Sequence, residues 1–107
     1  MRTRVFLNPS DNTLAGRYPE DCEHIHIVLD SSDATFTVRL PDCKLPEHKE
    51  FIFYNLPEIG SGHNVTIIPV TGQEINVRQF SHVLIPQDSA TFVSDLRKRW
   101  LLSDINH

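Results

Sequence analysis

Polar and apolar residues alternate along most of this chain, and this period of two predicts β-strands rather than helices. Residues 22–29 alternate in this way, as expected for a strand with one buried face. Residues 35–40 repeat the pattern, and the polar residues 30–33 between the two segments favour a turn. We therefore expect these two strands to form a hairpin.

Two further patterns mark the middle of the chain. Residues 51–56, FIFYNL, are apolar on both faces, so we expect this strand to lie between two packed layers. The stretch GHNVTIIPVTGQEI, residues 62–75, predicts a second hairpin with its turn at residues 71–73. Because proline cannot donate a hydrogen bond to a neighbouring strand, Pro69 belongs at a strand end, at a sheet edge or at a bulge.

Short strands at residues 81–85 and 90–93 bring the total to about eight, at the spacing typical of sandwiches and barrels. A chain of 107 residues supports one hydrophobic core. The pattern thus predicts an all-β fold, a short-stranded antiparallel β-sandwich of jelly-roll-like form, in a domain that spans residues 22–107.

The two ends of the chain have weaker patterns. Residues 1–21 are polar and rich in turn residues, with one brief apolar patch at residues 5–7. We interpret residues 1–21 as an extended N-terminal arm, which either anchors on a neighbouring chain or is a loosely ordered terminus. Residues 94–105 suit either a helix capped by Ser94 or a hairpin that ends in a tryptophan strand, and both interpretations stay open at this point.

Composition and charge narrow the class of protein. Apolar residues make up 39% of the chain and charged residues 22%, which is typical of a globular protein. The net charge of -4 and a single dense basic run at residues 97–99 argue against nucleic acid as the main partner. There is neither a run of roughly 20 apolar residues nor a signal peptide, so we expect synthesis in a cytoplasm and no membrane partner.

Cys22, His24 and His26 are the sharpest candidates for chemistry. On a strand these side chains share one face, and imidazoles two residues apart can bind one metal ion. No further ligand follows at a suitable spacing, so a small cupin-like metal protein ranks third among the functions considered, and a polar outer face is the simpler interpretation. No nucleophile motif, phosphate loop or carboxylate pair stands out, so we expect neither an enzyme nor a cofactor.

The cysteine content gives no disulfide framework. Cys22 and Cys43 are the two cysteines, and they form no CxxC pair. We expect two reduced, partly buried thiols in a cytoplasm, while a disulfide between them becomes plausible only if the assembly lives outside the cell.

The motifs also follow one another in a characteristic order. A strand ending in Leu40-Pro41 is followed by FIFYNL, then GHNVTIIP, GQEI, ATFVSD and WLL. This order, over about residues 24–103, resembles a β-sandwich module of tailed bacteriophages that occurs in capsid cement (decoration) proteins and at the tips of tail fibres and tailspikes. Leu96 stands where that family usually has glycine, and residues 47–50 replace its usual proline-glycine. The resemblance favours the hairpin interpretation of residues 94–105.

The resemblance implies a homotrimer without catalytic residues. Such a structural virion protein binds the major capsid protein on the outer capsid surface and stabilises the shell. In the alternative, the module is a fibre or tailspike tip that binds a host receptor or a host surface carbohydrate. Residues of the N-terminal arm and of the basic run are the candidate contacts with the capsid or another partner: Arg2, Arg4, Phe6, Arg97, Lys98 and Arg99.

Overall fold

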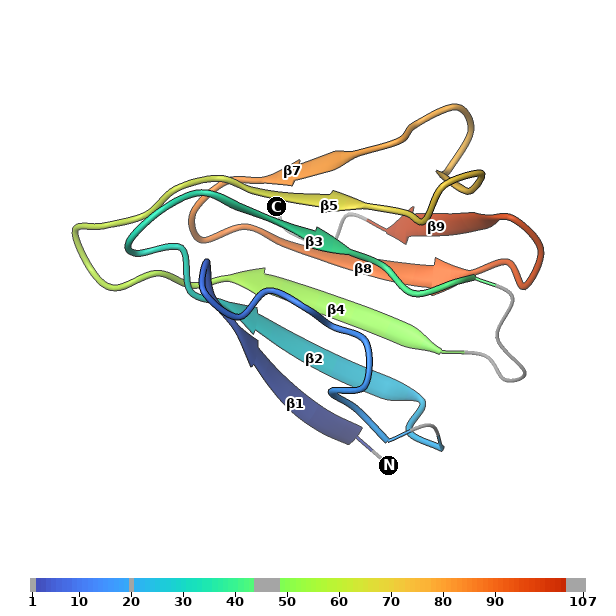
Figure 1. Ribbon diagram of the computed structural model, residues 1–107, viewed down its shortest axis with the longest axis horizontal. Coiled ribbons are helices and arrows are strands. Elements are labelled where there is room, and N and C mark those ends of the chain that lie inside the picture. The colour runs from blue at the N-terminus through green and yellow to red at the C-terminus, as the bar shows by residue number, and fades with distance from the viewer. Residues whose placement is uncertain (1, 20, 44–48, 104–107) are drawn as a thin grey trace.

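The computed structural model describes residues 2–19, 21–43 and 49–103. These residues form nine strands and no helix, which confirms the predicted all-β class (Figure 1). The strands are β1 (Arg2–Leu7), β2 (His24–Leu29), β3 (Phe36–Arg39), β4 (Glu50–Asn55), β5 (Val65–Ile68), β6 (Glu74–Ile75), β7 (His82–Leu84), β8 (Ser89–Ser94) and β9 (Arg99–Ser103).

The strands assemble into two sheets that share one core. The six-stranded sheet has the order β1-β2-β4-β8-β9-β6, and the three-stranded sheet has the order β3-β5-β7. The inward side chains of both sheets form one buried cluster. Phe51 of β4 meets Trp100 of β9 edge to face at 5.3 Å, and Phe53 meets Phe92 of β8 in the same way at 5.4 Å. The core is therefore built around the middle of the six-stranded sheet.

The first half of the chain winds between the two sheets in a solenoid-like path. Strands β2 and β4 lie in the larger sheet and β3 and β5 in the smaller one, so each coil contributes one strand to each sheet. As a result, β1 pairs with β2, β2 with β4, and β3 with β5, all in parallel. The two hairpins predicted at residues 22–40 and 62–75 are therefore wrong, because the turns carry the chain across the core to the opposite sheet.

The antiparallel pairs lie in the second half of the chain. Strand β5 pairs with β7, β4 with β8, and β8 with β9. Strand β6 pairs with β9 in parallel, so the prediction of a purely antiparallel sandwich is wrong, and only these three pairs of the described strands are antiparallel. Pro69 directly follows the last residue of β5, where its missing donor costs no ladder hydrogen bond, as predicted.

The C-terminal segment forms the predicted hairpin over its described residues, 94–103. Strands β8 and β9 pair with Ser94 opposite Trp100, and Leu96 sits in the turn with a φ of 64°. This left-handed backbone conformation favours glycine, so a leucine at this position is strained. Residues 104 and 105 of the predicted segment lie outside the described residues.

The expected N-terminal arm is instead an edge strand of the larger sheet. Strand β1 pairs with β2 along its whole length, and Val5 and Leu7 point into the core. Leu14, in the loop between β1 and β2, is also buried, with 1% of its surface exposed. Because the apolar patch in the sequence spans only residues 5–7, its pattern was too short to distinguish a strand from an arm.

Candidate functional site

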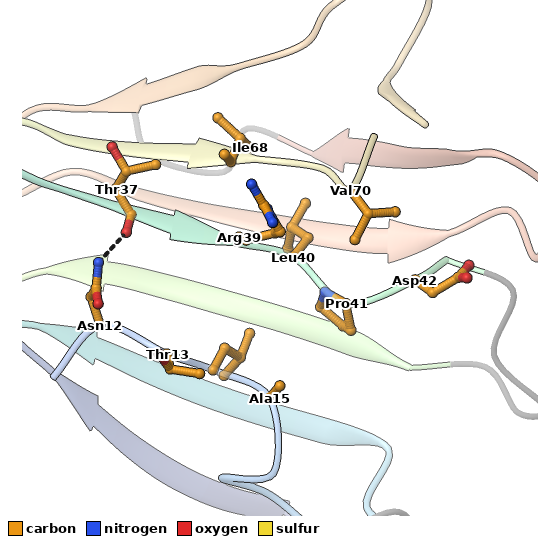
Figure 2. A pocket seen from close by; sticks show the side chains of 11 residues that line it. Asn12, Thr13, Ala15, Thr37, Arg39, Leu40, Pro41, Asp42, Ile68 and Val70 are labelled. Atoms are coloured by element: carbon orange, nitrogen blue, oxygen red, sulfur yellow. Dashed lines mark hydrogen bonds between the residues drawn. The ribbon is translucent and has the colours of Figure 1, made fainter. Parts of the chain in front are cut away.

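A groove lies along the free edge of the three-stranded sheet, between β3 and the loop formed by residues 12–15 (Figure 2). Its volume is about 550 Å³. One wall is formed by residues 12–15, and the other by residues 37–42. Ile68 and Val70, beyond β3, complete the lining.

The groove exists because residues 12–15 run beside β3 without pairing to it as a strand. Leu14 anchors this loop in the core, and the turn at residues 8–11 is closed by two backbone hydrogen bonds between Asn8 and Asp11. One cross-connection reaches β3: Asn12 Nδ2 donates a hydrogen bond of 2.8 Å to the backbone oxygen of Thr37. A side chain therefore bridges a gap that a neighbouring strand would otherwise fill.

The wall formed by β3 carries backbone groups that point into the groove. In a parallel ladder, alternate residues of a strand face the same neighbour. The backbone N–H of Leu40 donates to the oxygen of Ile68 at 2.7 Å, so residues 38 and 40 face β5. Thr37 and Arg39 consequently turn their backbone N–H and C=O groups the other way, toward residues 12–15.

The groove is lined by one positive and one negative side chain, those of Arg39 and Asp42. The side chain of Arg39 is exposed and makes no ion pair or hydrogen bond with another described residue. Asp42, on the same wall, accepts a hydrogen bond of 2.6 Å from Gln73 Nε2, and Gln73 Oε1 accepts one of 2.9 Å from the backbone of Cys43. Asp42 is therefore held by Gln73, while Arg39 leaves a positive charge beside the groove.

The predicted metal candidates do not come together. Cys22 precedes β2 and is fully buried, with its thiol donating to the backbone oxygen of His24 at 3.3 Å. The prediction that Cys22 shares a face with His24 and His26 is therefore wrong, because the strand begins only at His24. Within the part of the chain that the structure describes, no group of three or more histidine, cysteine or acidic side chains could hold a metal ion.

Each histidine of β2 instead pairs with a residue of β4 on the outer face of the larger sheet. His24 Nδ1 lies 2.9 Å from Glu50 Oε2. His26 Nδ1 lies 3.0 Å from Tyr54 Oη, and the two rings are stacked with their centroids 5.9 Å apart. These pairs form a polar outer face, as the simpler interpretation expected.

The basic run lies in the turn between β8 and β9. Asp95 Oδ1 accepts hydrogen bonds from the backbone N–H groups of Arg97, Lys98 and Arg99, at 2.8, 3.1 and 3.1 Å. Burial acts to raise the pKa of Asp95, but these backbone donors outweigh it and lower that pKa overall. Arg97 and Lys98 are exposed and remain accessible to a partner.

Arg99 differs from its two neighbours because it is tied to the protein itself. Its Nε and NH2 atoms lie 3.2 and 2.8 Å from Glu74 Oε1 on the adjacent strand β6. The side chains of Arg99 and Glu74 are only 28% and 15% exposed. Arg99 is therefore less available to a partner than Arg97 and Lys98.

The other predicted contacts lie on β1, at the opposite edge of the larger sheet from β6. Arg4 is exposed, and Phe6 is 60% exposed on the same face. Arg2 begins the strand, and its side chain is outside the described part of the structure. Three strands, β2, β4 and β8, separate β1 from β9, so the two groups of candidates do not form one cluster.

Four exposed apolar side chains on and beside β7 were not identified from the sequence. Val77, Phe80, Val83 and Ile85 are 64%, 64%, 46% and 56% exposed. We call these four residues the β7 strip, since they lie on β7 and its flanking turns. The alternation at residues 81–85 was visible in the sequence, but it does not say which face is covered.

Comparison with known proteins adds no identification. No family model, no curated protein and no solved structure matches this chain. Among the described residues, no helix is long and apolar enough to cross a membrane. The fold class is all-β, and the function is inferred from the surfaces described above.

Proposed function

We propose that this protein is a structural virion protein, a homotrimeric cement protein that binds the outer surface of a tailed-phage capsid and stabilises the shell. The resemblance of residues 24–103 to cement proteins is the sequence support. The observation that carries the proposal is the β7 strip, because these four apolar side chains within residues 77–85 are 46–64% exposed and lie on and beside an edge strand, where a partner surface can cover them.

The place of the β7 strip in the fold suits self-association. Strand β7 is an edge of the three-stranded sheet, so its outer backbone groups have no neighbouring strand among the described residues. Exposed edges of this kind are normally covered or blunted in folded proteins. Three copies of one strip can meet around a three-fold axis, where Val83 and Ile85 become buried.

The face that contacts the capsid is separate from the trimer axis in this proposal. Arg4 and Phe6 on β1 and the exposed pair Arg97 and Lys98 are the contacts with the major capsid protein. Each chain contributes a weak contact, and three linked contacts combine into a strong one. Because the trimer engages only the assembled shell, its binding free energy stabilises that shell.

The alternative, a fibre or tailspike tip that binds a receptor or carbohydrate, rests on the same resemblance. The groove along β3 gives it little support as a sugar site, since none of its lining residues is aromatic. Sugar sites commonly use an aromatic ring as a flat apolar surface.

Solution mass by light scattering tests the trimer. We expect a mass of three chains for the wild type and dissociation in Val83→Lys, whose charge lies in the strip. Leu101→Lys is the matched control, because Leu101 is 45% exposed against 46% for Val83 and lies on the outer side of the other sheet. A wild-type protein that is monomeric at all concentrations would refute the proposed trimer.

Shell binding is tested by co-sedimentation with expanded capsids of the virus that encodes the chain. The wild-type trimer should sediment with the shells and raise their melting temperature. The double variant Arg97→Gln and Lys98→Gln should keep the trimer mass but bind less. Trimers that stay in the supernatant with such shells would refute the cement role and leave the fibre-tip alternative.

A further inference from the structure

The geometry points to a peptide-binding site in the groove between β3 and residues 12–15. Its occupant is an extended segment of another protein that adds to the β3 edge as a strand and places a carboxylate against Arg39. This inference goes beyond the proposed function and does not depend on it, because β3 and β7 are opposite edges of the three-stranded sheet.

The backbone of β3 is prepared for an added strand. Thr37 and Arg39 direct their N–H and C=O groups into the groove, as the ladder with β5 requires. Asn12 Nδ2 already occupies the position of a strand donor, 2.8 Å from the oxygen of Thr37. An extended peptide would supply backbone donors and acceptors at the same spacing, which is how strand addition binds peptides.

The side chains around this edge are of the kind that a peptide strand needs. Ile68, in register with Arg39, and Val70 provide partly exposed apolar surface on the β3 side, and Ala15 is a small side chain on the loop side (Figure 2). Alternate side chains of an added strand point to the same face, so every second residue of the peptide can rest on this apolar surface. The lack of an aromatic ring in the lining favours a peptide over a sugar.

The positive charge of Arg39 favours a peptide with an acidic side chain. Arg39 is exposed and makes no ion pair with a described residue, and Asp42 is engaged by Gln73 at 2.6 Å. Asp42 keeps its negative charge, but a peptide side chain placed beside Arg39 meets the guanidinium, so an acidic side chain gains a partner there, whereas a lysine meets a like charge.

The test uses three acetylated, amidated hexapeptides of sequence Thr-Val-Xaa-Val-Thr-Val, in which Xaa is Glu, Gln or Lys. Titration of the isotope-labelled protein by NMR up to millimolar peptide reports both affinity and location. We expect the Glu peptide to bind best, with the largest amide shifts at Thr37 and Arg39. The Lys peptide should bind roughly fivefold more weakly, the size of one exposed ion pair.

Two variants and a control make the result specific. Arg39→Gln should weaken the Glu peptide roughly fivefold and leave the Gln peptide unchanged. Thr13→Trp, a lining position exposed at the surface, should fill the groove and abolish binding of all three peptides. Arg78→Gln removes another exposed arginine, outside the groove, and should not change the binding of any of the three peptides.

The outcomes distinguish a failure of the peptide-binding site from a failure of the proposed trimer. Val83→Lys should still bind the Glu peptide even where it loses the trimer mass. The peptide-binding site would be overturned if none of the three peptides changed the amide shifts. It would also be overturned if the shifts persisted in Thr13→Trp. An Arg39→Gln variant that changes the solution mass but not peptide binding would also overturn it, because the groove would then contact a second copy.

Discussion

The hydroxyl of Ser31 donates a hydrogen bond of 2.7 Å to Oδ1 of Asn55, and both side chains are completely buried. Asn55 Nδ2 donates in turn to the backbone oxygens of His63 and Leu84, at 3.0 and 2.9 Å. The last residue of β4 thus ties together the turn after β2, the loop before β5 and the strand β7. This one amide connects the two sheets at one end of the core.

Replacing that amide should be costly. We expect Asn55→Leu to lower the free energy of unfolding by roughly 2–4 kcal/mol, because it leaves one buried carbonyl group, one partly buried carbonyl group and one buried hydroxyl without their partner. Urea unfolding followed by the fluorescence of Trp100, the single tryptophan, measures the loss. Asn64→Ala, at an exposed position before β5, should stay within about 0.5 kcal/mol of the wild type. Equal losses in both variants would contradict a special role for Asn55.

The ion pair between Glu74 and Arg99 predicts a dependence of stability on pH. The side-chain hydrogen bond from Arg99 is the main cause that lowers the pKa of Glu74, and burial partly opposes it. Because the folded-state pKa is the lower one, the pair contributes stability above the ordinary glutamate pKa of about 4.3. That contribution is lost as the pH falls through the lowered value of the folded state.

Thermal melts of the wild type and Glu74→Gln, recorded from neutral pH down through the ordinary glutamate pKa, provide the measurement. The wild type should be the more stable protein near neutral pH, and the two melting temperatures should converge as the solution becomes more acidic than pH 4. Glu58→Gln, an exposed position, removes the same charge without the Arg99 partner. A constant difference between the wild type and Glu74→Gln at all pH values would argue against the pair.

The turn between β8 and β9 offers a stabilising substitution. Leu96 has a φ of 64°, a conformation that is costly for a side chain with a Cβ atom. We expect Leu96→Gly to raise the free energy of unfolding by about 1 kcal/mol, after the larger entropy of unfolded glycine is included. Leu101→Gly is the matched control: Leu101 is similarly exposed but lies inside β9, so glycine there should destabilise. Chemical unfolding that shows the same sign for both variants would disprove the strain at residue 96.

The two cysteines should be unreactive in the folded protein. Cys22 and Cys43 form no disulfide with each other and are completely buried. Because a thiol reagent reaches a buried sulfur only after local or global opening, labelling should be slow in buffer and complete in denaturant. The count of labelled thiols under both conditions checks this, and rapid labelling of either cysteine in the native protein would show that its surroundings open readily.

Alternation along the chain correctly predicted the all-β class, and the chemistry of proline correctly placed Pro69 at a strand end, whereas residues 94–105 suited a helix and a hairpin equally well. These predictions succeeded because they depend on local properties, namely the face on which a side chain lies and the donor that a residue lacks. The positions of the candidate metal ligands were harder to predict. Cys22 and His26 obey the same alternation, yet Cys22 is buried because the strand starts after it.

Other features needed the arrangement in space. A period of two assigns a side chain to a face but says nothing of the partner strand, so a hairpin and a parallel coil have the same pattern. The groove joins residues 12–15 to residues 37–42, two segments separated along the chain, and no sequence motif marks it. Arg99 has an ion-pair partner, whereas Arg39 has none among the described residues. This difference also depends on which strands lie beside each arginine.

By itself the sequence determined that this chain forms short strands around one core, because local alternation and turn residues limit each segment to a strand or a loop. Tertiary structure alone decided that the chain winds between two sheets, that residues 2–7 form an edge strand, and that β3 keeps an open edge beside a groove. The physical reason is that strand pairing is a contact between distant segments, and only the packing of the whole core selects among pairings that satisfy the same pattern.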